Sequence, residues 1–427
     1  MKKISFIVLG LLGLLNACTT SPDATQVKGL STPGIEATAP YFTTDHNGNA
    51  VLCWTEKDGG DSLYRLKYAV FDAEKNSFNT AVTVPASAGC SNSAESMGKI
   101  AFKADGTVFA VFSKRFPNEK NPYAGAIYYS LSDDAGKSWS PSRFLHSDTS
   151  HSYGRSFFDV ATLKDGELAA IWLDGRYGKS IKGSALFFAR TEKGKGFGAD
   201  NCLDKGTCEC CRTAIFTDDA GKIHLAYRSI MFPSALTAKQ VRDMVYKVSA
   251  DNGKTFTSAR TISNDNWEIE GCPHSGPSLA ADRKGLQVVW FTAGGGAGLY
   301  YSSAKNPESG FGRRTLLTTS GRHPQLVALS QDKAAMVCEE PISAEPDHKM
   351  NHSHGSMNMS HPPAGAAKII LSILKNGSLE KTVAVTEGKE ADHHAVLIPV
   401  KEKILIAWVR EQKPAAKLCY TLMNLNE

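Results

Sequence analysis

The feature that most constrains the fold of this chain is an internal repeat that runs through most of its 427 residues. Each copy begins with an apolar stretch, a polar turn and a second apolar stretch. An aromatic residue closes the second stretch in every copy but the sixth, where Cys338 takes its place. These first halves lie at 41–54, 99–112, 157–172, 213–227, 277–290, 324–338 and 394–408. A unit this short cannot bury its apolar faces alone, so the copies must pack against one another.

The second half of each copy is an aromatic-rich stretch, a turn and a short final strand. It recurs at 66–84, 127–145, 186–203, 244–262, 299–317 and 369–385. The seventh copy has only 418–423, and residues 26–30, which precede the first copy, can supply its missing strand. Four short strands per unit, closed by an N-terminal strand, predict an all-β, seven-bladed β-propeller, with six blades as the alternative. Residues 26–427 are expected to form this single domain.

Two turns in the second halves share the pattern S-x-D-x-G-x-x-(W/F). They contain Ser132, Asp134, Gly136 and Trp139, and Ser249, Asp251, Gly253 and Phe256. The pattern resembles the Asp box, or bacterial neuraminidase repeat, of the sialidase superfamily, and 71–78, 191–197 and 302–311 look like degraded copies. The resemblance implies a sialidase-like propeller in which the Asp accepts hydrogen bonds from turn amides and the Gly supplies the bend. It implies no activity, because Asp boxes are structural.

The N-terminus has the features of an export signal. Lys2 and Lys3 precede an apolar run at 4–15, which is too short to span a bilayer. Leu15-Asn16-Ala17-Cys18 follows and resembles the bacterial lipoprotein box. This resemblance implies removal of 1–17, lipidation of Cys18 and a tether at 18–25, with an ordinary cleaved signal as the alternative. Because Thr19 rather than Asp follows, we expect anchoring in the outer membrane, facing the periplasm.

Charge and cysteine content narrow the function classes. Loss of the two lysines lowers the formal net charge from +5 to +3, which is too weak a bias to indicate nucleic-acid binding. Of ten cysteines, nine remain after lipidation of Cys18, so they cannot all pair within the chain. Cys53, Cys338 and Cys419 fall inside strands and are expected to be buried core thiols.

Soft and borderline metal ligands gather in the loops that enter the first strand of several units. In a propeller these loops lie on one face, around the central channel. They contain Cys208, Cys210, Cys211, Cys272, His274, His323, His393 and His394. Thiolate and imidazole ligands favour a soft metal ion, so we predict a metal site here. The alternative is disulfide bonding, with Cys202–Cys208 and a bond from Cys272 to Cys210 or Cys211 as plausible pairs.

A Met/His-rich segment at 347–363 lies between the second and third strands of the sixth unit, and therefore on the same face. It contains Met350, His352, His354, Met357, Met359 and His361, followed by two prolines. Imidazole and thioether together suit copper, with Met favouring Cu(I). The leading hypothesis is therefore a lipoprotein that captures copper, passes it inward and exchanges it with a periplasmic metal-handling protein. A polar insertion with incidental metal affinity is the alternative.

Two other functions remain open. The sialidase resemblance implies three arginines that hold a substrate carboxylate, an Asp acid/base and a Tyr–Glu nucleophile pair. Candidates on the expected face are Arg155, Arg176, Arg212, Arg228 and Arg322, with Asp174, Tyr153 and Glu270. Seven units and the absence of arginine at 34–40 depart from that family, and loop-bracing ion pairs are the simpler interpretation. The chain would then be an exo-sialidase or other glycoside hydrolase, or else a non-catalytic protein-interaction scaffold.

Overall fold

The structure is a computed structural model that describes residues 26–425 except 234–238, 272, 330–331 and 343–365. It is all-β, as predicted. Within these residues the helical segments are three short 3-10 turns, Pro85–Ser87, Gly178–Ser180 and Pro307–Ser309. None of the described helices has the length and apolar character needed to cross a membrane.

Strand pairing follows the sequence repeat. Neighbouring strands pair antiparallel in consecutive groups, each of which begins at a predicted first half. The groups are β2 (Ala37–Thr44), β3 (Ala50–Lys57), β4 (Tyr64–Asp72), β5 (Ser77–Phe78) and β6 (Val82–Thr83); β7 (Lys99–Phe102), β8 (Val108–Arg115), β9 (Gly125–Ser132) and β10 (Arg143–Phe144); β11 (Arg155–Thr162), β12 (Leu168–Asp174), β13 (Ser184–Arg190) and β14 (Asn201–Thr207); β15 (Ala214–Thr217), β16 (Ile223–Met231), β17 (Val241–Ser249) and β18 (Arg260–Thr261); β19 (Ser278–Asp282), β20 (Gly285–Thr292), β21 (Gly298–Ala304) and β22 (Thr315–Thr318); β23 (Arg322–Ala328), β24 (Lys333–Pro341), β25 (Ala367–Lys375) and β26 (Ser378–Ala384); and β27 (Ala391–Val400), β28 (Lys403–Glu411) and β29 (Lys417–Asn424).

The N-terminal strand β1 (Lys28–Gly29) pairs antiparallel with β29. Lys28 lies opposite Tyr420, and the amide of Leu30 donates to the carbonyl of Leu418 at 2.9 Å. The segment that precedes the first repeat therefore pairs with the last repeat, as the sequence predicts.

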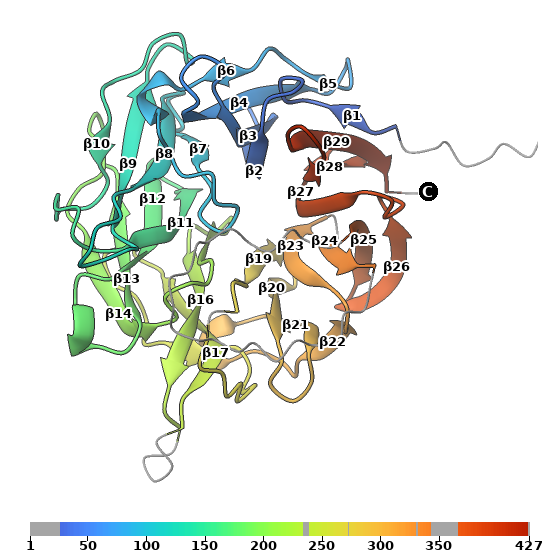
Figure 1. Cartoon of the computed structure of the whole chain (residues 1–427). Helices are drawn as coiled ribbons and strands as arrows, with labels where there is room; N and C mark the ends of the chain where they lie inside the picture. The colour runs from blue at the N-terminus through green and yellow to red at the C-terminus, as the bar shows by residue number, and fades with distance from the viewer. Residues whose placement is uncertain (1–25, 234–238, 272, 330–331, 343–365, 426–427) are drawn as a thin grey trace, which may run out of the picture.

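The sheets are arranged around a common centre, and Figure 1 shows the first strands of the groups nearest to it. A cavity of about 410 Å³ lies there. Its lining includes Tyr41, Lys99, Asp159, Ile215, Leu279, Gln325 and Val396, which come from β2, β7, β11, β15, β19, β23 and β27. The fold is therefore propeller-like.

A buried tryptophan recurs at the end of the second strand every 118 residues, at Trp54, Trp172, Trp290 and Trp408. Each is at most 1% exposed, and each indole N–H donates to a buried carboxylate at 2.8–3.1 Å. The acceptors are Glu56, Asp174, Asp265 and Asp392, which also pair with Lys67, Arg155 and Arg176, Arg314 and Arg410. We call these sets the Trp–carboxylate braces. Each supplies the partners that a buried charge requires.

Aromatic contacts join five of the strand groups to the group before them. The aromatic after the turn between the third and fourth strands packs edge-on against a third-strand ring of the preceding group. The pairs are Trp139–Tyr68, Phe197–Tyr129, Phe256–Phe188 and Phe311–Tyr246, with centroids 5.0–6.3 Å apart, and Phe78 meets Tyr420 of β29 at 4.9 Å.

The two S-x-D-x-G turns have the hydrogen bonds expected for them. Asp134 Oδ1 accepts from the amide of Ser138 and Ser132 Oγ from that of Gly136, both at 2.8 Å. In the second turn Asp251 Oδ1 accepts from the amide of Thr255 at 2.9 Å. Gly136 has a φ of +88° and Gly253 of +85°, a conformation that favours glycine.

Candidate functional site

Bulges at the start of two first strands carry histidines. The pairing register shifts between Arg322 and Gln325 in β23 and between His393 and Val396 in β27. His323 and His394 lie inside these shifts with φ of +48° and +56°, and His274, before β19, has +46°. The same bulge places Ala39 of β2 and Phe157 of β11 at φ of +55° and +53°, so left-handed backbone at this position recurs in the repeat. Bulges also redirect side chains, which here brings histidines from separate groups together.

These histidines surround two buried glutamates. We call the set Glu95, Arg212, His323, Glu339, His393 and His394 the mouth cluster. Glu95 is 4% exposed and lies 2.9 Å from Arg212 Nε and 3.7 Å from His323 Nε2. One ligand atom from each of Glu95, His323 and His394 lies within 4.8 Å of the others.

Glu339, at the end of β24, connects the three histidines. Its Oε2 lies 3.2 Å from Nδ1 of His323 and 3.4 Å from Nδ1 of His393. Its Oε1 accepts a hydrogen bond from the backbone amide of His394. Two nitrogens nearby, His393 Nε2 and His394 Nδ1, are buried without a hydrogen-bond partner among the described residues. An imidazole nitrogen without a partner can bind a ligand or take up a proton.

The surroundings in the mouth cluster shift the pKa values of His323 and His394 in opposite directions. Burial alone would lower the pKa of His323, but the charge and hydrogen bond of Glu339 raise it above the ordinary value. Burial lowers the pKa of His394 to about 4, against the attraction of Glu339, and His323 adds to the lowering. Their rings are 5.9 Å apart. The site therefore pairs an imidazole whose pKa is raised with one whose pKa is lowered, an arrangement suited to acid–base chemistry.

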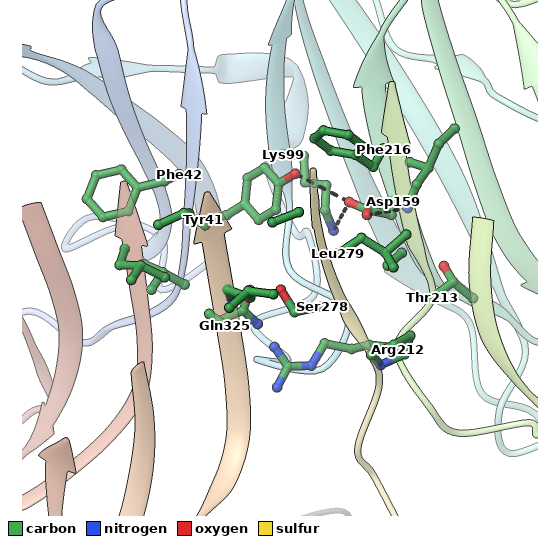
Figure 2. Close-up of a pocket in the computed structure, with 18 of the residues that line it drawn as sticks. Tyr41, Phe42, Lys99, Asp159, Arg212, Thr213, Phe216, Ser278, Leu279 and Gln325 are labelled. Atoms are coloured by element: carbon green, nitrogen blue, oxygen red, sulfur yellow. Dashed lines mark hydrogen bonds and ion pairs between the residues drawn. The ribbon is translucent and has the colours of Figure 1, made fainter. Parts of the chain in front are cut away.

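Arg212 connects the mouth cluster to the central cavity, because it also lines one end of that cavity (Figure 2). Deeper in the cavity Tyr41 Oη donates to Asp159 Oδ1 at 3.3 Å, and Lys99 Nζ lies 3.8 Å from the same oxygen. Burial raises the pKa of Asp159 and lowers that of Lys99. The cavity therefore has a polar interior with an arginine at its mouth.

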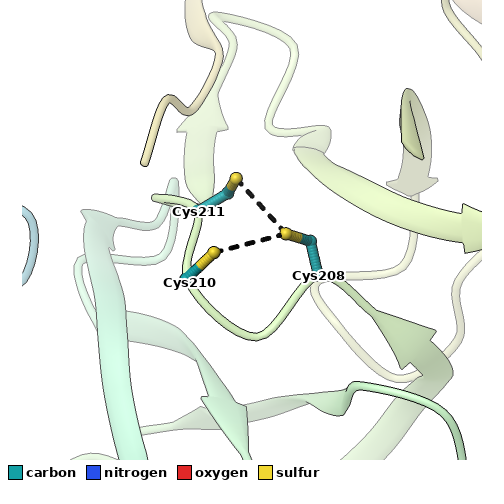
Figure 3. Close-up of side chains that lie close together, drawn as sticks. All are labelled: Cys208, Cys210 and Cys211. Atoms are coloured by element: carbon teal, nitrogen blue, oxygen red, sulfur yellow. Dashed lines mark hydrogen bonds between the residues drawn. The ribbon is translucent and has the colours of Figure 1, made fainter. Parts of the chain in front are cut away.

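Three cysteines form a second cluster before β15, which Figure 3 shows in isolation. Cys208 Sγ lies 3.6 Å from Cys210 Sγ and 3.4 Å from Cys211 Sγ, and Arg242 Nη1 donates to Cys208 Sγ at 3.1 Å. Hydrogen bonds from the other two thiols lower the pKa of Cys208 well below its ordinary value, and Arg242 adds to this. We call Cys208, Cys210 and Cys211 the thiol cluster.

Several of the predicted metal ligands lie outside the described residues. Cys272 and the loop residues Met350, His352, His354, Met357, Met359 and His361 lie outside the described residues, as does Cys18. The described cysteines form no disulfide bond, so the Cys202–Cys208 pair is not made: Cys202 is exposed on β14 and Cys208 is buried. Cys53, Cys338 and Cys419 are buried, as expected.

The arginines of the sialidase alternative are dispersed. Arg155 and Arg176 both pair with Asp174, at 3.0 and 2.7 Å, and Arg155 lies over the ring of Tyr153. Arg228 donates to the carbonyls of Arg242 and Phe291, Arg322 lies over the ring of Phe291, and Glu270 is exposed. Of the five, only Arg212 belongs to the mouth cluster.

Sequence reasoning missed both glutamates of the mouth cluster. Glu95 lies in the loop before β7, in a polar stretch without a motif. Glu339 had a weak signal, since an acidic pair, Glu339 and Glu340, directly follows the apolar run 334–338. An unpaired carboxylate is costly at the end of a buried strand, so such a pair indicates nearby cations.

Comparisons with known proteins give likeness in structure but not in sequence. No family model matches the chain, and a search of curated proteins finds no match. The polysaccharide lyase Uly1 is 12% identical, with a TM-score of 0.53 and coverage of 96% of this chain and 94% of that one. A protein of unknown function from Dyadobacter fermentans is 12% identical, with a TM-score of 0.50 and coverage of 93% and 99%. The Hadza microbial sialidase Hz136 is 13% identical, with a TM-score of 0.48 and coverage of 89% and 77%. The first two likenesses show a shared fold, so the chain has an all-β, propeller-like fold that also occurs in a polysaccharide lyase.

Proposed function

We propose that this protein is a seven-bladed propeller that cleaves an anionic glycan at the mouth cluster. The observation that carries the proposal is the pair of histidines with opposite pKa shifts, held 5.9 Å apart by strained bulges beside Arg212. Because the fold also occurs in a polysaccharide lyase, this alternative is favoured over copper binding as the main activity.

For the fold, the proposal assigns one blade to each strand group and closes the ring at β1–β29. It is supported by the cavity lined by every first strand and by the contact of Phe78 with Tyr420. Closure would remove the exposed sheet edges of the first and last repeats. Seven repeats at regular spacing argue against six blades.

The proposed reaction is β-elimination from a uronate. Neutral His394 takes the proton from the carbon beside the carboxylate, and the C–H electrons form a carbon–carbon double bond. The bond to the leaving glycosidic oxygen breaks, and protonated His323 donates its proton to that oxygen. Arg212 exchanges its pairing with Glu95 for the substrate carboxylate, which stabilises the charge that develops there.

The test is an assay of the purified protein, without Cys18, against a panel of uronate-containing polysaccharides. Elimination creates an unsaturated uronate that absorbs in the ultraviolet, whereas hydrolysis creates reducing ends without that absorbance. We expect absorbance to grow, and His394→Ala and His323→Ala each to lower kcat by roughly 10²–10⁴-fold, the usual contribution of a positioned acid or base.

The matched control is His46→Ala, which removes an exposed histidine from the turn between β2 and β3. Full activity is expected of this variant. The pH profile adds a second criterion: kcat/KM should fall at low pH as His394 protonates near its pKa of about 4, and at high pH as His323 loses its proton. Reducing ends without ultraviolet absorbance would show that the protein is a hydrolase and not a lyase. Activity that survives both histidine substitutions would show that the active site lies outside the mouth cluster.

The cellular location is a separate proposal: we propose that the protein is a lipoprotein anchored through Cys18 in the outer membrane. Metabolic labelling with a fatty-acid analogue should mark the wild-type protein and leave a Cys18→Ala variant unlabelled. Label on both proteins would place the lipid elsewhere.

A further inference from the structure

We propose that the thiol cluster binds one Cu(I) ion through three sulfur ligands. This inference is independent of the glycan-cleaving activity, because it uses other residues and another chemistry. Three sulfurs within 4.8 Å of one another can close around a single ion with small side-chain adjustments. Thiolates are soft ligands that suit Cu(I).

Two buried arginines, Arg242 and Arg228, supply positive charge near the thiol cluster. Arg242 and Arg228 are 4% and 1% exposed, and the Nε atom of each is buried without a hydrogen-bond partner among the described residues. Arg242 donates to Cys208 Sγ at 3.1 Å. A buried guanidinium with an unused donor is costly unless an anion lies beside it. Three thiolates and one Cu(I) carry a net charge of −2. The two arginines supply positive charge nearby, although Arg242 also pairs with Glu209 at 3.1 Å.

Two competing states of the cluster are less favourable. A disulfide would use two of the three sulfurs and leave the third unbound, while Arg242 would keep its ion pair with Glu209, 3.1 Å away. A structural zinc site needs four protein ligands, and among the described residues the cluster offers three. The short C-x-C-C loop suits a three-coordinate ion, and Cys210, at 6% exposed, is the least buried of the three and the most accessible to an incoming ion.

The experiment is a titration of the reduced, Cys18-free protein with Cu(I) against a competing chelator, followed by X-ray absorption at the copper edge. One tight equivalent with three sulfur ligands is expected, together with sulfur-to-copper charge-transfer absorption. Cys210→Ser should abolish that equivalent. The matched control is Cys202→Ser, which removes an exposed thiol eight residues earlier and should leave binding unchanged.

The wild-type spectrum keeps the proposal testable if Cys210→Ser fails to fold. Copper bound only through nitrogen, or through thioether sulfur in a protein whose cysteines stay open to alkylation, would overturn the proposal and favour the Met/His-rich segment. A Cys208–Cys211 disulfide that persists in the reduced sample would overturn it as well. Retention of lyase activity by a copper-free Cys210→Ser variant would support the independence of the two sites.

Discussion

Two sets of buried carboxylates in this molecule contrast sharply. At the Trp172 brace, Asp174 accepts from the indole of Trp172 and from Arg155 and Arg176. In the mouth cluster, Glu339 binds histidines on left-handed bulges, and two ring nitrogens have no hydrogen-bond partner among the described residues. In the first set the carboxylate faces permanently charged arginines, although Arg176 Nε is buried without a hydrogen-bond partner in the part of the chain that the structure describes. In the second set it faces histidines, whose charge changes with pH. Permanent ion pairs suit a structural role, whereas histidines beside a buried carboxylate also suit proton transfer.

The largest effect is expected at the brace. Asp174→Ala leaves Arg155 and Arg176 without their shared carboxylate, and Arg155 is fully buried. Removal of one partner of a buried ion pair should lower the free energy of unfolding by about 3–5 kcal/mol. Chemical denaturation measures this. A loss below 1 kcal/mol would mean that Asp148 and Asp200, which also pair with these arginines, compensate for the missing carboxylate.

A smaller effect is expected at the brace nearest the mouth cluster. Asp392→Ala removes the acceptor of Trp408 and the partner of Arg410, whose side chain is 19% exposed and can reach water. The free energy of unfolding should fall by about 1–3 kcal/mol, since one buried donor remains unmatched. Asp392→Asn keeps an acceptor for Trp408 and should lose less. Equal losses in both variants would assign the effect to the charge alone.

The mouth cluster should respond in the opposite way. His394→Gly removes a strained side chain and supplies the residue that best tolerates a φ of +56°. The free energy of unfolding should stay within about 1 kcal/mol of wild type, in the stabilising direction, while glycan cleavage is lost. Denaturation and the ultraviolet assay on one preparation test both. A loss of unfolding free energy as large as that of Asp174→Ala would show that the mouth cluster stabilises the fold, as the Trp–carboxylate braces do.

The smallest effect is in the pH dependence of stability. Because the folded pKa of His323 is raised, its contribution is fully present below the unfolded pKa of about 6.5 and disappears as pH rises through the folded value. The difference in unfolding free energy between wild type and His323→Ala should therefore shrink as pH rises above about 6.5. A constant difference would show that His323 does not carry the extra proton.

The repeat made the fold predictable because each unit has its own apolar and aromatic markers. Even the pairing of residues 26–30 with the last strand followed from the missing fourth strand in the seventh unit. The site was less accessible to sequence reasoning. The bulges at His323 and His394 are not marked by glycine, and histidine is a weaker signal of left-handed backbone than glycine is.

The arginines show a second limit of the sequence. Arg155 pairs with Asp148, seven residues earlier, and Arg176 pairs with Asp200, 24 residues later. Which charges are cancelled depends on how the loops fold, and the sequence positions of the arginines alone do not indicate it. The thiol cluster was easier to find, because its three cysteines lie within four consecutive residues.

The contact between the two ends of the repeat array has a consequence for how the chain folds. The amide of Leu418 donates to Ser31 Oγ across 387 residues of sequence. Contacts this distant slow folding, since most of the chain must be ordered before they form. The pairing of β1 with β29 should therefore be the last part of the fold to form and the first to open. In a hydrogen-exchange experiment, β1 and β29 should lose protection before the internal strands do.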